Sequence, residues 1–77
     1  MRLTANNIAY INETHHKGGK ITIAVVMKSH AMSDTRFYEC HYDLIGLPNA
    51  VMKYISTHKK EMIETDEKLQ IVKYQYK

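Results

Sequence analysis

Residues 36–77 read RFYECHYDLIGLPNAVMKYISTHKKEMIETDEKLQIVKYQYK, and this stretch indicates a strand, a helix and a second strand. Polar and apolar residues alternate over residues 36–44, which is typical of a strand with one buried face. Pro48 suits the first turn of a helix, which is predicted to run to Ile63 because apolar residues recur at helical spacing. β-Branched and aromatic residues then predict a strand over residues 69–76. One helical stripe is expected to face the sheet: Val51, Ile55, His58 and Met62.

Residues 20–28 form the clearest strand signal in the N-terminal half, because β-branched residues alternate along them. Residues 3–17 are ambiguous. We interpret them as a helix, since Thr4 can cap it and Gly18 can end it. The competing interpretation makes residues 8–14 a strand that pairs with the next strand across Gly18 and Gly19.

These elements predict an α+β fold in which a three-stranded mixed sheet carries helices on one face. The predicted chain order is αββαβ, with βββαβ as the alternative if the first segment is a strand. A strand, helix, strand crossover favours parallel pairing with a right-handed connection. No repeat or linker interrupts the chain, so residues 1–77 are expected to form a single domain.

Composition narrows the classes of protein that fit this chain. Hydrophobic residues make up 44% of it, but no apolar run approaches the roughly 20 residues that a membrane-spanning helix needs. The N-terminal residues lack the apolar centre of a signal peptide, and the single Cys40 cannot form an internal disulfide. We therefore expect a cytoplasmic protein without a membrane partner. The net charge of +3 permits nucleic-acid binding without requiring it.

Catalytic and metal-binding patterns are not found in the sequence. Cys40 and His41 are adjacent in a predicted strand, so their side chains point to opposite faces and cannot act as nucleophile and base. The spacing of the five histidines does not match that of zinc sites. We therefore expect no enzymatic activity, no cofactor and no metal.

Aromatic and basic residues together give the strongest functional signal. The C-terminal run 73–77, KYQYK, interleaves rings with ammonium groups. Such a surface suits protein partners, which Tyr often anchors, and also single-stranded nucleic acid, whose bases stack on rings. Rings are expected to supply the contact area and lysines to steer association, and the predicted partner-binding residues are Phe37, His41, Lys53, Lys60, Lys73, Tyr74 and Tyr76.

In format the chain resembles the small accessory proteins that bacteriophages express to modify host machinery or host defence. The resemblance covers the motif-free, one-domain plan of strand 36–44, helix 48–63 and strand 69–76, and no functional residue is carried over from it. It implies stoichiometric binding and steric occlusion in the host cytoplasm. The leading hypothesis is an inhibitor or modulator that binds a host protein through the helix-free sheet face or a sheet edge. The alternatives are a nucleic-acid-binding regulator on the same surface and a homo-oligomer that covers this face with its own copy.

Overall fold

The computed structural model describes residues 3–28, 37–43 and 46–77, and for residues 37–43 it describes the backbone alone. Over these residues the elements are η1, a 3₁₀ turn (Ala5–Asn7), β1 (Ile8–His15), β2 (Ile21–Lys28), β3 (Phe37–Asp43), α1 (Asn49–Thr57), β4 (Lys60–Asp66) and β5 (Ile71–Tyr76). The strands predicted at residues 20–28, 36–44 and 69–76 correspond to β2, β3 and β5. Arg36 and Leu44 lie outside the described residues.

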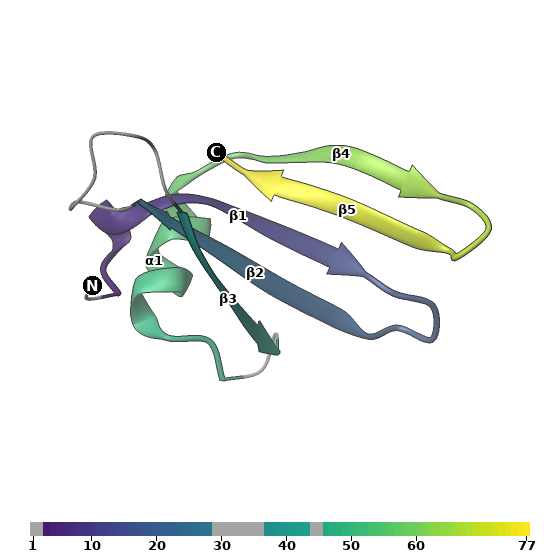
Figure 1. The fold of residues 1–77 in the computed structure, drawn as a ribbon, viewed down its shortest axis with the longest axis horizontal. Coiled ribbons are helices and arrows are strands. Elements are labelled where there is room, and N and C mark those ends of the chain that lie inside the picture. Colours follow the sequence, from purple (N-terminus) through teal and green to yellow (C-terminus); the bar gives the residue numbers. More distant parts are fainter. Residues whose placement is uncertain (1–2, 29–36, 44–45) are drawn as a thin grey trace.

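The five described strands form one antiparallel sheet in the order β3-β2-β1-β5-β4 (Figure 1). The chain crosses from the edge strand β3 through α1 to the other edge strand, β4. β3 and β4 therefore run in the same direction but never pair. The class is α+β as predicted, whereas the three-stranded mixed sheet and the order αββαβ are wrong. The alternative order βββαβ also lacks β4.

A β-hairpin replaces the helix that was predicted over residues 3–17. β1 pairs with β2 from Ile8 opposite Met27 to His15 opposite Ile21, with one irregularity between Ile8 and Tyr10. Gly18 and Gly19 reverse the chain at φ angles of 88° and 87°, which glycine adopts at little cost. The competing interpretation of residues 8–14 as a strand paired across these glycines is therefore the correct one.

The helix ends at Thr57 rather than at Ile63, and the remaining residues of the predicted helix enter β4. Side chains donate hydrogen bonds to backbone carbonyls in the last turn of α1, which would otherwise lack partners. The Thr57 hydroxyl donates to the carbonyl of Lys53 at 3.0 Å, and His58 Nδ1 donates to the carbonyl of Tyr54 at 2.8 Å. β4 gains backbone hydrogen bonds from β5 instead. Of the stripe expected to face the sheet, Val51 is fully buried, whereas Met62 is 62% exposed and lies on β4.

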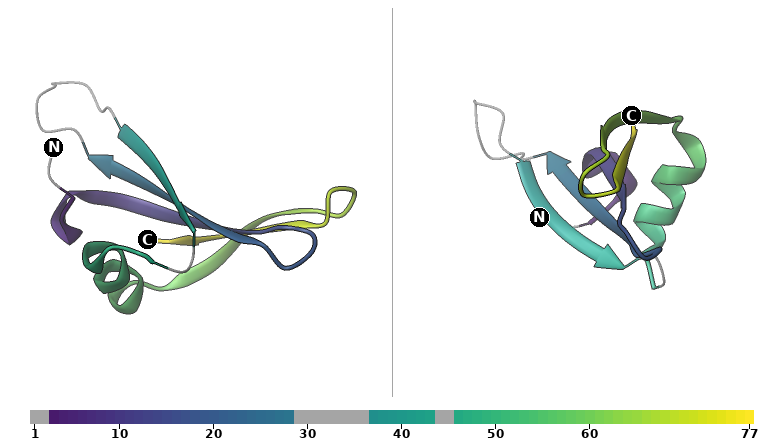
Figure 2. Two further views of the ribbon diagram at one scale, coloured as in Figure 1. Left: turned by 90° about the horizontal axis from the view of Figure 1, so that it is seen from below. Right: turned by 90° about the vertical axis from the view of Figure 1, so that its right-hand side faces the viewer.

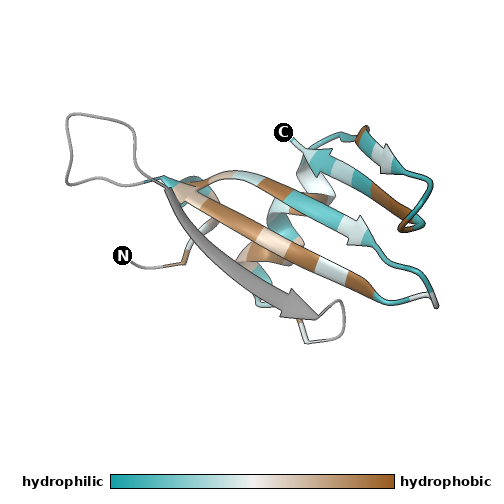
Figure 3. Cartoon of the chain, turned by 45° about the vertical axis from the view of Figure 1, so that its right-hand side comes forward, coloured by the Kyte–Doolittle hydropathy of each residue, from teal (hydrophilic) through white to brown (hydrophobic). Residues whose placement is uncertain are grey.

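α1 packs against one face of the sheet, which we call the helix face, and none of the described helices covers the other, which we call the open face (Figure 2). Hydrophobic residues follow β2 through the centre of the sheet, while β1 turns hydrophilic partway along (Figure 3). Each buried Ile or Val side chain contributes about 1.5–3 kcal/mol to stability. The core on the helix face consists of Ile8, Ile11, Ile23, Val25, Met27, Val51, Tyr54 and Tyr76.

Both long hairpins, β1–β2 and β4–β5, extend beyond α1 (Figures 1 and 2). The helix face is therefore covered by α1 at one end only. The edge strand β4 carries a bulge between Met62 and Glu64 and four charged residues, features that hinder pairing with a further strand. The bare part of the helix face is thus a more promising binding surface than the β4 edge.

Candidate partner-binding site

Glu13 is a buried carboxylate on the helix face of β1. Glu13 follows the core residue Ile11 by two positions on β1, so both side chains are on the helix face. The Cα atom of Glu13 is paired with that of Ile23 on one side and that of Tyr74 on the other. Only 8% of its side chain is exposed, so the carboxylate requires internal partners.

Three side chains supply these partners. Tyr76 donates its hydroxyl proton to Glu13 Oε1 at 3.1 Å. Lys60 Nζ and His15 Nε2 contact Glu13 Oε2 at 3.1 Å and 2.8 Å. The donors come from β5, β4 and β1, so one carboxylate connects three neighbouring strands.

The contacts of Glu13 also determine its protonation. Burial raises the pKa of the carboxyl, but the hydrogen bonds from His15, Lys60 and Tyr76 and the charge of Lys60 outweigh burial and hold the pKa below its ordinary value. The hydrogen bond to Glu13 in turn raises the pKa of Lys60. Glu13 is therefore ionised near neutral pH, and its oxygens are engaged with neighbouring groups.

Tyr74 lies beside this carboxylate and is only partly buried. The His15 ring meets its ring edge to face, with 5.0 Å between centroids, and Lys60 Nζ lies 4.9 Å from the Tyr74 centroid. Met62 is opposite Tyr74 in the β4–β5 pairing and therefore shares the helix face. We call the surface formed by His15, Lys60, Met62 and Tyr74 the Tyr74 platform.

The structure brings together three of the seven predicted binding residues, Lys60, Tyr74 and Tyr76. Tyr76 is 9% exposed and belongs to the core, so it supports the site from beneath. The rings of Tyr74 and Tyr76 lie on the helix face, not on the helix-free face where the interface was expected.

The other predicted residues lie apart from the platform. Lys73 is on the open face, with its Nζ 3.7 Å from Glu64 Oε2. Lys53 is exposed on α1. Phe37 and His41 belong to β3, at the far edge of the sheet, and their side chains lie outside the described residues. The rings and charges interleaved over residues 73–77 therefore separate onto two faces.

Glu13 and His15 were not among the predicted site residues. Both fall in the segment interpreted as a helix, in which Glu13 would point away from the face that carries Ile11. Alternation of Ile11, Glu13 and His15 before a Gly-Gly turn was the signal that could have found them.

The polar groups around Glu13 are engaged with one another. The ionised, engaged carboxylate of Glu13 is a poor general acid, and the ring nitrogen of His15 that faces it is already bonded. Among the described residues, no three His, Cys, Asp or Glu side chains are grouped so as to hold a metal ion. In the same part of the chain, no helix is long and apolar enough to cross a membrane.

Comparison with known proteins adds no relative. No family model matches the chain, and neither the curated proteins nor the solved structures contain a match.

Proposed function

We propose that this chain is a non-enzymatic interaction protein that binds a partner protein through the Tyr74 platform. In this proposal it acts in the cytoplasm of a bacterial host, as an inhibitor or modulator of the kind that bacteriophages express. The partner covers the bare end of the helix face, and this contact blocks the surface through which the partner binds its own ligands. Stoichiometric binding of this kind needs no reactive group.

The observation that carries the proposal is the half-buried Tyr74 ring between His15 and Lys60 on a sheet face that α1 leaves bare. Tyr is enriched among the residues that dominate protein interfaces, because its ring offers a large contact area with little entropy to lose. Glu13 holds Lys60 and His15 in place, so the platform is ordered before a partner arrives.

Exposed apolar side chains also concentrate on the hairpin that carries Tyr74. The described residues expose four large hydrophobic side chains, and three of them are on the β4–β5 hairpin: Met62, Ile63 and Leu69, at 62%, 46% and 61% exposure. Apolar groups concentrated on one protruding element are typical of interaction sites. These apolar side chains favour a protein partner over a ligand that binds through charge alone.

Nucleic acid is the second candidate partner, and the charges favour it less. Lys60 is paired with Glu13 and Lys73 with Glu64, so neither ammonium is free to neutralise a phosphate beside Tyr74. A groove that follows a nucleic-acid backbone needs several unpaired cations along its length. Salt separates the candidates, because phosphate-driven binding weakens steeply with salt whereas a ring-anchored protein interface responds mildly.

Affinity capture from bacterial lysate tests the proposal. The tagged chain is compared with Tyr74→Ala and with a matched control, Gln75→Ala. Gln75 neighbours Tyr74 in sequence but lies on the open face, where it bonds Asn12 at 3.1 Å. We expect Tyr74→Ala to weaken capture of the partner at least tenfold and Gln75→Ala to leave it unchanged.

Met62→Arg provides a second variant in case Tyr74→Ala loosens the fold, since Met62 is exposed and packs little. Folding of each variant is checked by circular dichroism. Capture that survives both platform variants, or that Gln75→Ala abolishes, contradicts the proposal. Light scattering of the purified chain shows whether a second copy occupies the platform instead.

A further inference from the structure

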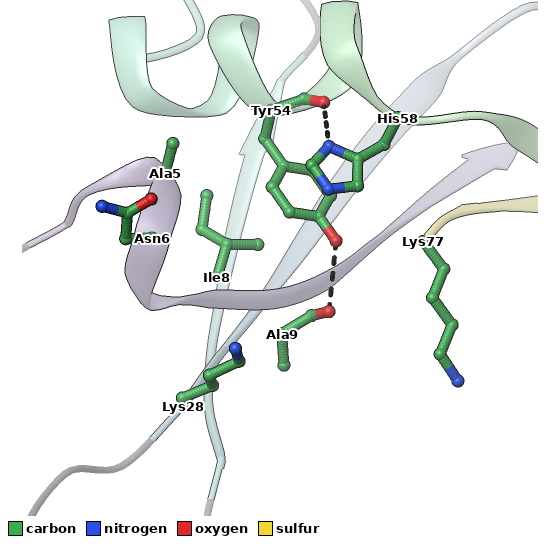
Figure 4. Close-up of a pocket in the computed structure, with 8 residues that line it drawn as sticks. All are labelled: Ala5, Asn6, Ile8, Ala9, Lys28, Tyr54, His58 and Lys77. Atoms are coloured by element: carbon green, nitrogen blue, oxygen red, sulfur yellow. Dashed lines mark hydrogen bonds between the residues drawn. The ribbon is translucent and has the colours of Figure 1, made fainter.

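A pocket of about 330 Å³ lies at the other end of the molecule from the hairpin tips, between the start of β1 and the end of α1 (Figure 4). None of the Tyr74 platform residues lines it. Its lining combines a polar amide, an aliphatic side chain, a tyrosine and three basic residues from distant parts of the chain: Asn6, Ile8, Tyr54, Lys28, His58 and Lys77.

The fold brings the three basic residues to this pocket by separate pairings. Ile8 opposite Met27 sets the start of β1 beside the end of β2, where Lys28 follows. The backbone N–H of Lys77 donates to the carbonyl of Lys59 at 3.4 Å, which holds Lys77 beside the residue after His58. The convergence depends on tertiary structure and could not be found from sequence spacing.

Among the described residues, no acidic side chain lines the pocket. In the same part of the chain, neither Lys28 nor Lys77 is ion-paired with a carboxylate side chain. This contrasts with Lys60 and Lys73, which both have carboxylate partners. An anion that enters the pocket therefore meets ammonium groups without displacing an internal partner that the structure describes.

His58 adds an oriented ring to these charges. It stacks on Tyr54 with 3.7 Å between centroids and 8° between planes. Its Nδ1 bonds the carbonyl of Tyr54 at 2.8 Å, and because a carbonyl only accepts, Nδ1 carries the proton. Tyr54 is itself anchored by the hydrogen bond from its hydroxyl to the carbonyl of Ala9 at 3.1 Å. Nε2 is the ring nitrogen left for a ligand, and it donates a hydrogen bond whenever the ring is protonated.

We propose that this pocket binds a phosphate group, either as free phosphate or as the monoester of a small molecule. Lys28 and Lys77 supply positive charge for the phosphate oxygens, and His58 Nε2 supplies a hydrogen-bond donor when its ring is protonated. A dianion is favoured over a carboxylate, because two unpaired lysines stabilise two negative charges better than one. The site is independent of partner binding at the Tyr74 platform.

The test is a titration of the isotopically labelled chain with sodium phosphate, followed by amide NMR at constant ionic strength. We expect saturable shifts centred on Asn6, Ile8 and Ala9, with a dissociation constant on the order of millimolar. Lys28→Ala and Lys77→Ala each weaken binding about two- to fivefold. Both residues are exposed, so these variants should remain folded.

Lys20→Ala is the matched control, because Lys20 is an exposed lysine beside the β1–β2 turn and does not line the pocket. The proposal is overturned by shifts that do not saturate, by an equal effect of Lys20→Ala, or by acetate that binds as tightly as phosphate. Glycerol phosphate separates the two sources of the group. If glycerol phosphate binds more tightly than inorganic phosphate does, a monoester is the ligand. If it binds no more tightly, free phosphate is the ligand.

Discussion

The hydroxyl of Tyr76 donates a 3.1 Å hydrogen bond to Oε1 of Glu13, and these two residues are 63 positions apart in the chain. Lys60 reaches the other oxygen of the same carboxylate. Because Tyr76, Glu13 and Lys60 belong to β5, β1 and β4, Glu13 fastens the C-terminal hairpin to the N-terminal one. The alignment of the Tyr74 platform depends on this attachment.

Glu13→Gln is expected to destabilise the protein, since the amide has nearly the same shape but lacks the negative charge that pairs with Lys60. Removing one partner of a buried, charge-assisted contact costs about 1–3 kcal/mol. For a domain of this size, each kcal/mol lowers the melting temperature by about 4–8 °C. Thermal unfolding followed by circular dichroism measures the change.

Glu61→Gln is the control for that substitution, because Glu61 is exposed on β4. Its melting temperature should match that of the wild-type chain. Equal melting temperatures for Glu13→Gln and the wild-type chain would show that the buried carboxylate does not stabilise the fold.

Acidic pH is expected to remove the contribution of Glu13 to the free energy of unfolding. Its pKa in the folded protein lies below the ordinary value of 4.5, so the unfolded chain takes up this proton first as the pH falls. The stabilisation is therefore present above about pH 4.5 and is lost as the pH drops through the lower, folded pKa. Urea unfolding at pH 7, 5, 4 and 3 should show the gap between the wild-type chain and Glu13→Gln closing. A gap that stays constant over this range would contradict the assignment.

Alkaline pH is expected to remove the contribution of Tyr76 to stability. Burial raises the pKa of the Tyr76 phenol, and the negative charge of Glu13 and the hydrogen bond to it raise the pKa further. The folded state therefore favours the neutral phenol, so its contribution is complete below pH 10 and is lost as the pH rises through the raised pKa. Tyr76→Phe should cost about 1 kcal/mol at pH 7 and be spared this alkaline loss. Urea unfolding of both proteins between pH 8 and 11 measures the difference, and parallel curves would refute it.

Substitutions in the turn between β1 and β2 test its backbone conformation. Gly18 and Gly19 have positive φ angles, and a Cβ atom at either position meets nothing within 4 Å. Gly18→Ala or Gly19→Ala should therefore destabilise by about 1–2 kcal/mol through backbone strain alone. Chemical denaturation measures the change. Unchanged or increased stability in both variants would contradict the positive φ angles at this turn.

Strands with strong alternation could be predicted from the sequence, and elements whose ends depend on distant residues could not. The segments of β2, β3 and β5 follow from local pattern because β-branched and aromatic residues dominate them. β1 contains an asparagine and a glutamate, which are poor strand formers, and Glu13 faces inward only because Lys60 and Tyr76 reach it from far along the chain. Residues 60–63 of β4 were assigned to the helix because the pairing of β4 with β5 cannot be seen in its own residues.

The candidate site shows the same division. Tyr74 and Lys60 could be selected as aromatic and basic residues, but whether they share a surface depends on strand register. Lys73 neighbours Tyr74 in sequence and still lies on the opposite face, whereas His15 is remote in sequence and contacts the Tyr74 ring. Composition identifies residue types that bind, and only the paired sheet determines which of them act together.

Protection of methionine from oxidation tests the central claim most directly, because the chain has a matched pair of exposed methionines. Met62 belongs to the Tyr74 platform and is 62% exposed, while Met52 is on α1 and is 51% exposed. Both should form sulfoxide at similar rates with dilute peroxide when the protein is free. With the captured partner bound, we expect Met62 to be protected and Met52 to react as before, as measured by peptide mass spectrometry. Protection of Met52 with continued oxidation of Met62 would contradict binding at the platform.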